Sequence, residues 1–135
     1  MNLTSETAVT QGMVLASLIG GIALACIAQL VAAFPAADDS PRERNVSGAV
    51  LWLAVTATLM MINVWSGIIF FMDDGADRYA IARVFYGGLF LAVAFFALGM
   101  AQMIAVRTPR LYRPMLVMFG GLLLAEAILG IVFLR

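Results

Sequence analysis

The chain has 135 residues, of which 64% are hydrophobic and 12% are charged, and its eight arginines balance eight carboxylates. This composition leaves too little polar surface for a water-soluble domain, and the few scattered arginines exclude a basic nucleic-acid-binding surface. The sequence has no histidine and one cysteine, which excludes histidine-ligated haem, most zinc sites and an intrachain disulfide.

Four segments exceed the roughly 20 apolar residues that a helix needs to cross a bilayer. They span residues 11–34, 48–72, 79–106 and 112–134. The sequence therefore predicts an all-α integral membrane protein in which residues 1–135 form a single four-helix transmembrane domain. Because the connections are short, consecutive helices are expected to be antiparallel, in an up-down-up-down bundle.

The first predicted helix is expected to be retained rather than cleaved as a signal peptide. Residues 1–11 contain Glu6 and no basic residue, whereas a signal peptide begins with a positively charged region. Pro35 ends the apolar run because it cannot donate the next helical hydrogen bond. Gln29 is expected to hydrogen-bond to a neighbouring helix, with a ligand-binding role as the alternative.

The second predicted helix carries the clearest polar stripe. Ser40-Pro41 is typical of a helix start, so this helix is expected to begin outside the lipid and to run over residues 41–72. Thr56, Asn63 and Ser66 lie on one face and must point toward protein or water rather than lipid. Asn63 is expected to bridge two helices, and the alternative is that it lines a narrow pathway with Ser66.

The fourth predicted helix contains Glu126, which is the only carboxylate well inside a span. A carboxylate in lipid is unfavourable unless it is paired or protonated, and no basic residue lies at a matching depth. One interpretation is a protonated or hydrogen-bonded Glu126 at a subunit contact, with Gln102 or Asn63 as an intrachain partner. The other is a site for proton coupling or cation binding.

A Gly-Gly pair followed by alanine occurs in three of the predicted helices. The second glycine and the alanine are four residues apart and share a helix face. These pairs are Gly21 and Ala25, Gly88 and Ala92, and Gly121 and Ala125. Small side chains let helix backbones approach closely in lipid, so we expect the three pairs to contact other helices of this chain or of a partner.

Four methionines flank the connection between the third and fourth predicted helices: Met100, Met103, Met115 and Met118. Thioethers bind Cu(I), which makes these residues a candidate copper site. Methionine is also a common filler of irregular cores, and no histidine or cysteine accompanies this group. The sequence therefore predicts no cofactor, and bound lipid is the expected ligand.

Arginines are concentrated on one side of the predicted bundle. The first and third connections contain Arg42, Arg44, Arg107, Arg110 and Arg113, whereas the other side contains Arg78, Arg83 and Arg135. Arginine collects on the cytoplasmic side of a membrane. We therefore expect both termini outside, with the arginine-rich loops in the cytoplasm, and a prokaryotic inner or plasma membrane as the location.

The sequence has no phosphate-binding glycine loop and no nucleophile paired with a base, so catalysis is not expected. Resemblance to known small membrane families is limited to the number of spans and to residues 58–67, which are loosely similar to the second helix of fluoride-channel proteins. We expect a non-catalytic subunit of a larger membrane complex, such as an energy-converting one, with lipids and other transmembrane subunits or copies of itself as partners. The alternative is a small homo-oligomeric transporter or channel with Glu126 and Asn63 lining its path.

Overall fold

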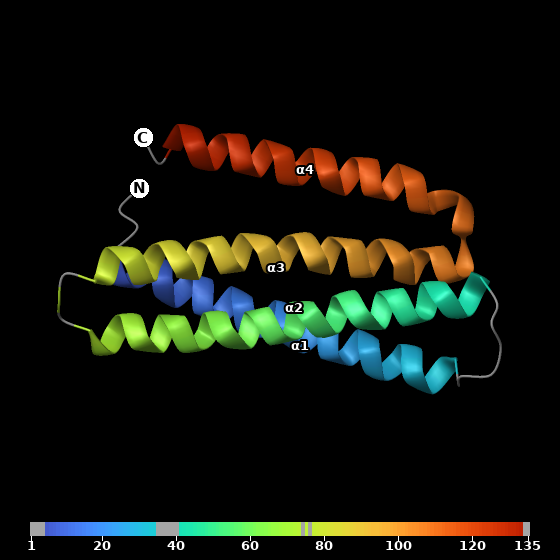
Figure 1. Cartoon of the computed structure of the whole chain (residues 1–135), viewed down its shortest axis with the longest axis horizontal. Coiled ribbons are helices and arrows are strands. Elements are labelled where there is room, and N and C mark those ends of the chain that lie inside the picture. The colour runs from blue at the N-terminus through green and yellow to red at the C-terminus, as the bar shows by residue number, and fades with distance from the viewer. Residues whose placement is uncertain (1–4, 35–40, 74, 76, 134–135) are drawn as a thin grey trace.

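The computed structural model describes residues 5–34, 41–73, 75 and 77–133, and the side chains of all these residues except 126 and 129–133. Every regular element in this part is helical: α1 (Glu6–Ala33), α2 (Pro41–Met72), α3 (Arg78–Arg107), the short 3₁₀ helix η1 (Pro109–Leu111) and α4 (Tyr112–Phe133) (Figure 1). The predicted all-α class is confirmed. Helix α2 has the bounds expected from the sequence, although Ser40, its expected cap, lies outside the described residues.

Three helices, α1 to α3, are long and apolar enough to cross a membrane. They contain 28, 32 and 30 residues. At a rise of 1.5 Å per residue they are about 42–48 Å long, which exceeds the roughly 30 Å hydrocarbon core of a bilayer. The fourth predicted span falls on α4, and because residue 134 and the last side chains of α4 lie outside the described part, this span stays a prediction.

The helices lie side by side along the long axis of the molecule (Figure 1). The end of α2 and the start of α3 lie at one end, and the end of α1, the start of α2 and η1 lie at the other. Helices α2 and α3 share the largest interface, and α1 packs mainly on α2. In the described part of the chain, α4 contacts only α3 and η1.

The core lies between α1, α2 and α3, in three clusters of buried side chains along the bundle. The cluster nearest η1 contains Ala23, Leu30, Val46, Ala49, Leu53 and Val106. The central cluster contains Ala16, Met60 and Ala92, and the cluster at the opposite end contains Val9, Phe70, Ala82 and Phe85. Alanine occurs in all three clusters, and its small side chain allows the close helix approach that packing in lipid requires.

Helix α4 differs from the other three because none of its described residues is buried. Val117 is 76% exposed and Leu124 is 63% exposed. Helices α1 to α3 therefore form the packed unit, and α4 is attached to one side of it through α3.

Candidate functional site

Asn63 and Thr56 are the buried polar residues of the stripe predicted on the second helix. Asn63 lies on α2, is 2% exposed and faces Gly88 of α3. A Cβ atom added to Gly88 would overlap the amide oxygen of Asn63 and lie 3.2 Å from its Cγ. The missing side chain of Gly88 thus makes room for Asn63. In the described structure the Asn63 Nδ2 group is buried and has no hydrogen-bond partner.

The hydroxyl groups of the same polar stripe form hydrogen bonds within α2. Thr56 Oγ1 donates to the Trp52 carbonyl oxygen at 2.8 Å, and Ser66 Oγ donates to the Ile62 carbonyl oxygen at 3.0 Å. Both hydroxyl protons are therefore used inside the helix that carries them. Asn63 is left as the polar residue of this stripe whose Nδ2 group has no partner among the described residues.

Gln102 occupies a second polar position at the α2–α3 interface. It lies on α3 over Gly48 of α2, where an added Cβ atom would be 2.8 Å from the Gln102 Cδ atom and 2.9 Å from its Nε2 atom. The buried Oε1 atom of Gln102 has no partner in the described structure. Gly48 and Asn63 are fifteen residues apart on α2, which is about 22 Å along a helix. Asn63 and Gln102 are therefore at different depths and do not form one site.

The two remaining candidate polar residues lie elsewhere. Gln29 is exposed on α1 and lines a hollow of about 390 Å³ between α1 and α3, together with Met103 and Arg107. Glu126 lies on α4, and its side chain is outside the described part of the structure. Among the described side chains, Asn63, Gln102 and Gln29 therefore lie apart and do not form one chemical site.

The small-residue pairs predicted to mediate helix contacts have different surroundings. Gly88 and Ala92 lie on the face of α3 that packs against α2, and Ala92 is fully buried. Gly21 and Gly121 have no described heavy atom within 4 Å of an added Cβ atom, and Ala25 and Ala125 are exposed. None of these four residues is buried in the described structure, and Gly21 borders a groove between α1 and α2.

Other glycines make close contacts that the sequence analysis did not single out. In α1, a Cβ atom added to Gly20 would lie 3.3 Å from the Met60 Cβ atom, and one added to Gly12 would lie 2.6 Å from the Phe85 Cε1 atom. Gly12 and Gly20 are eight residues apart with Ala16 between them. Gly12, Ala16 and Gly20 thus have the same four-residue spacing as Gly21 and Ala25, but on a neighbouring face of α1. This is the face that packs against Met60 and Phe85.

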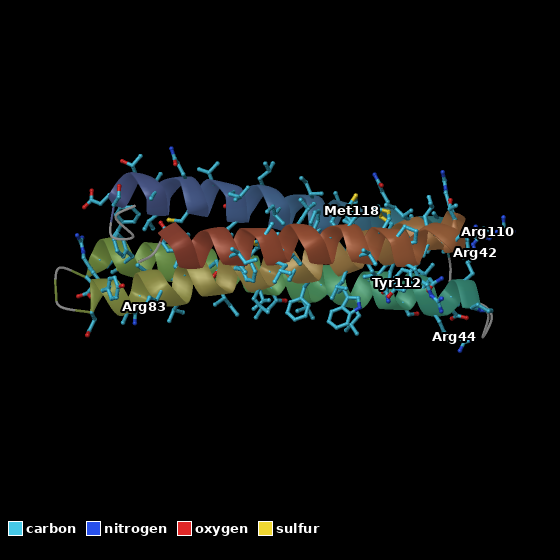
Figure 2. All side chains as sticks on the ribbon, turned by 90° about the horizontal axis from the view of Figure 1, so that it is seen from above. Arg42, Arg44, Arg83, Arg110, Tyr112 and Met118 are labelled. Carbon is cyan, nitrogen blue, oxygen red and sulfur yellow. The ribbon has the colours of Figure 1, made fainter. Side chains whose placement is uncertain are left out.

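The four methionines do not share one environment. Met103 packs against the cluster of Leu53 and Val106, whereas Met118 is 52% exposed on α4 (Figure 2). Among the described residues, no group of three or more histidine, cysteine or acidic side chains is arranged to hold a metal ion.

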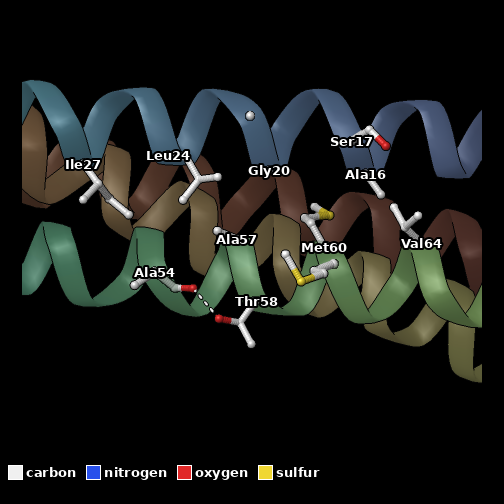
Figure 3. A pocket seen from close by; sticks show the side chains of 12 residues that line it. Ala16, Ser17, Gly20, Leu24, Ile27, Ala54, Ala57, Thr58, Met60 and Val64 are labelled. Carbon is white, nitrogen blue, oxygen red and sulfur yellow. Dashed lines mark hydrogen bonds between the residues drawn. The ribbon is translucent and has the colours of Figure 1, made fainter.

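A groove of about 560 Å³ runs between α1 and α2 on the outside of the bundle (Figure 3). Its walls are formed mainly by small and apolar side chains, including Ala16, Gly20 and Ala57. Its two hydroxyl groups form hydrogen bonds within their own helices: Ser17 Oγ donates to the Met13 carbonyl oxygen at 2.9 Å, and Thr58 Oγ1 donates to the Ala54 carbonyl oxygen at 2.9 Å. The groove therefore presents an apolar surface whose hydroxyl donors are already used.

Comparison of the chain with protein-family models, with curated proteins and with solved structures gives no match.

Proposed function

We propose that this chain is a non-catalytic accessory subunit of a multi-subunit membrane complex, of the kind that includes energy-converting complexes. In this proposal its four helices cross a prokaryotic inner or plasma membrane in up-down-up-down order. Both termini lie outside, and the arginine-rich loops lie in the cytoplasm. The position of α4 is the observation that carries the proposal.

Helix α4 presents a bare surface suited to another helix. It contacts only α3 and η1 in the described part of the chain, and an added Cβ atom at Gly120 or Gly121 would meet no described atom within 4 Å. Exposed leucines of a membrane helix can contact lipid without an energetic penalty. Exposed glycines, in contrast, leave unused the close backbone-to-backbone packing by which membrane helices associate. A partner helix seated on Gly121 and Ala125 would supply that contact.

The interior of the bundle also favours a structural role. Val9, Leu53, Phe70 and Phe85 are fully buried between α1, α2 and α3. The described polar side chains are dispersed, and Asn63 and Gln102 lie over glycines of the facing helix. This packing supports a scaffold that joins helices more directly than it supports a water-filled path or a catalytic centre.

The test is purification from native membranes in a mild detergent, followed by native mass spectrometry. We expect other transmembrane chains to be retained at a fixed stoichiometry, and Gly121→Ile to release them because the isoleucine side chain fills the predicted contact. Gly87→Ile is the matched control, since Gly87 also has no described atom within 4 Å of an added Cβ atom but lies on α3. Recovery of the chain as a homo-oligomer, or equal loss of partners in both variants, would contradict the proposal.

The second candidate is a small homo-oligomeric transporter or channel in which Asn63 and Glu126 line the path. The buried and unpartnered Nδ2 group of Asn63 favours this function, because an unsatisfied amide in the membrane interior is unfavourable unless water or an ion reaches it. Glu126→Gln in proteoliposomes tests it through proton-coupled flux. Measurable flux that this substitution abolishes would favour the transporter, and the absence of flux from the unsubstituted protein would exclude it.

A further inference from the structure

The arginine-rich end of the molecule contains an open hollow. It measures about 600 Å³ and lies between the first turns of α2 and the last turns of α3. Its lining consists of Pro41, Arg42, Asn45, Ala105, Val106, Arg107 and Pro109. The hollow therefore combines two guanidinium groups from different helices with a side-chain amide and an apolar floor.

Positive charge dominates this end of the described structure. Arg42, Arg44, Arg107, Arg110 and Arg113 lie near it, and Glu43 is the described carboxylate among them. Figure 2 shows Arg42, Arg44 and Arg110 at this end and Arg83 at the other. The described ion pair between Arg78 and Glu6 lies at the opposite end of the molecule.

The guanidinium group of Arg42 has an aromatic neighbour. Its Cζ atom lies 4.7 Å from the centre of the Phe34 ring. Contact with a ring face favours a cation and positions it without using up its N–H donors. Arg42 can therefore stay beside the hollow and keep those donors for an anion.

The position of the hollow matches the depth of lipid headgroups. Helices α2 and α3 contain 32 and 30 residues, so each is about 45 Å or more in length and extends beyond a hydrocarbon core of about 30 Å. The hollow lies where α2 begins and α3 ends. Basic pockets at this level, between membrane helices, suit the headgroups of anionic lipids.

We propose that the hollow binds the phosphate group of an anionic phospholipid, with Arg42, Arg107 and Asn45 as its hydrogen-bond donors. The planar fork of arginine matches two phosphate oxygens at once. Pro41 and Pro109, which are exposed and line the hollow, give the apolar part of the lipid a surface to contact. A free phosphate ion would have no use for that surface, so the lipid is the source of phosphate to which this arrangement is suited.

The experiment uses the full chain, purified, stripped of lipid and then exchanged with a mixture of phosphatidylglycerol and phosphatidylcholine. Native mass spectrometry counts the lipids that each chain retains. The unsubstituted protein should retain phosphatidylglycerol in preference to phosphatidylcholine. R42Q/R107Q should reduce that retention about tenfold or more, which is the effect of losing charge-assisted contacts to phosphate. R42K/R107K keeps the charge but removes the forked geometry, and it should give an intermediate loss.

R44Q/R110Q is the matched control because it removes the same charge from the same end but leaves the lining of the hollow unchanged. It should retain phosphatidylglycerol within about twofold of the unsubstituted protein. Equal losses in R44Q/R110Q and R42Q/R107Q would overturn the proposal, since binding would then depend on overall charge. Lack of preference between the two lipids, or displacement of the lipid by millimolar inorganic phosphate, would also overturn it. Circular dichroism and size-exclusion elution confirm that each variant is folded, and no partner chain is needed, so the outcome does not depend on the proposed subunit role.

Discussion

Gly99→Ala perturbs the largest helix interface of this protein at a position where the neighbouring atoms have little freedom. Gly99 is buried on α3, opposite Leu53 of α2, which is fully buried. A Cβ atom added to Gly99 would lie 2.8 Å from the Leu53 Cγ atom, 2.9 Å from its Cδ2 atom and 3.3 Å from its backbone nitrogen. Carbon atoms in unstrained contact are about 3.5–4.0 Å apart. Leu53 would have to move by about 0.7 Å, and a change of rotamer does not move its backbone nitrogen.

The magnitude follows from two opposing contributions. Adding a methyl group to a filled core costs about 1–3 kcal/mol, whereas alanine favours a helix over glycine by up to about 1 kcal/mol. Gly87→Ala gains the same helix propensity on the same helix, and its added Cβ atom meets no described atom within 4 Å. The difference in free energy of unfolding between the two variants isolates the steric cost. We therefore expect Gly99→Ala to be less stable than Gly87→Ala by about 1–3 kcal/mol.

Unfolding in mixed micelles of a mild detergent and dodecyl sulfate, followed by far-ultraviolet circular dichroism, measures this difference. Both variants should begin with the helix content of the unsubstituted protein. Two variants that differ by less than about 0.5 kcal/mol, the range of ordinary surface substitutions, would refute the close approach of Gly99 to Leu53. A more stable Gly99→Ala variant would refute it as well.

Three shorter predictions concern the other buried and exposed positions of α1 to α3. A Cβ atom added to Gly12 would lie 2.6 Å from the Phe85 Cε1 atom. Phe85→Leu should therefore restore part of the stability that Gly12→Ala loses. A double-mutant cycle of unfolding free energies should give a coupling energy of about 0.5–3 kcal/mol between the two positions. Trp65 is 62% exposed, whereas Trp52 is half-buried. Brominated lipid should therefore quench the fluorescence of Trp65, measured in W52F, more strongly than that of Trp52, measured in W65F. Equal quenching in the two variants would contradict this difference in exposure. Asn63→Leu keeps the buried volume and removes the unpartnered Nδ2 group, so it should change the unfolding free energy by less than about 1.5 kcal/mol. A loss of more than about 3 kcal/mol in the same unfolding assay would indicate a bound water or ligand on Asn63.

The positions of the helices could be predicted from the sequence because apolar length and helix-starting residues act locally. The apolar run after Pro41 has the length of a spanning helix, and proline at the first helical position needs no backbone donor. Helix α2 accordingly begins at Pro41 and ends at Met72. These signals depend on a residue and its immediate neighbours, so no tertiary information is required.

The face of α1 that packs inside this chain could not be predicted in the same way. The sequence indicated Gly21 and Ala25 as contacts to a helix of this chain or of a partner, whereas the contact with Met60 of α2 is made by Gly20. Adjacent residues point about 100° apart around a helix, so an error of one residue selects a different face. A soluble helix would mark its buried face by polarity. In a membrane helix the lipid-facing side is as apolar as the buried side, and several faces of α1 carry small residues at four-residue spacing.

The polar residues at the α2–α3 interface have a physical consequence that does not depend on transport. Asn63 of α2 lies over Gly88 of α3, and Gln102 of α3 lies over Gly48 of α2, so each helix gives one polar side chain and one glycine to the interface. Sliding the helices by one turn would move Asn63 from Gly88 to Val84 or Ala92, which carry the Cβ atom that Gly88 lacks. A buried amide displaced onto a side chain loses its space, and Leu53 of α2 would lose its space in the same way on moving from Gly99 to Phe95 or Met103. The three glycine contacts therefore favour one register of the α2–α3 interface.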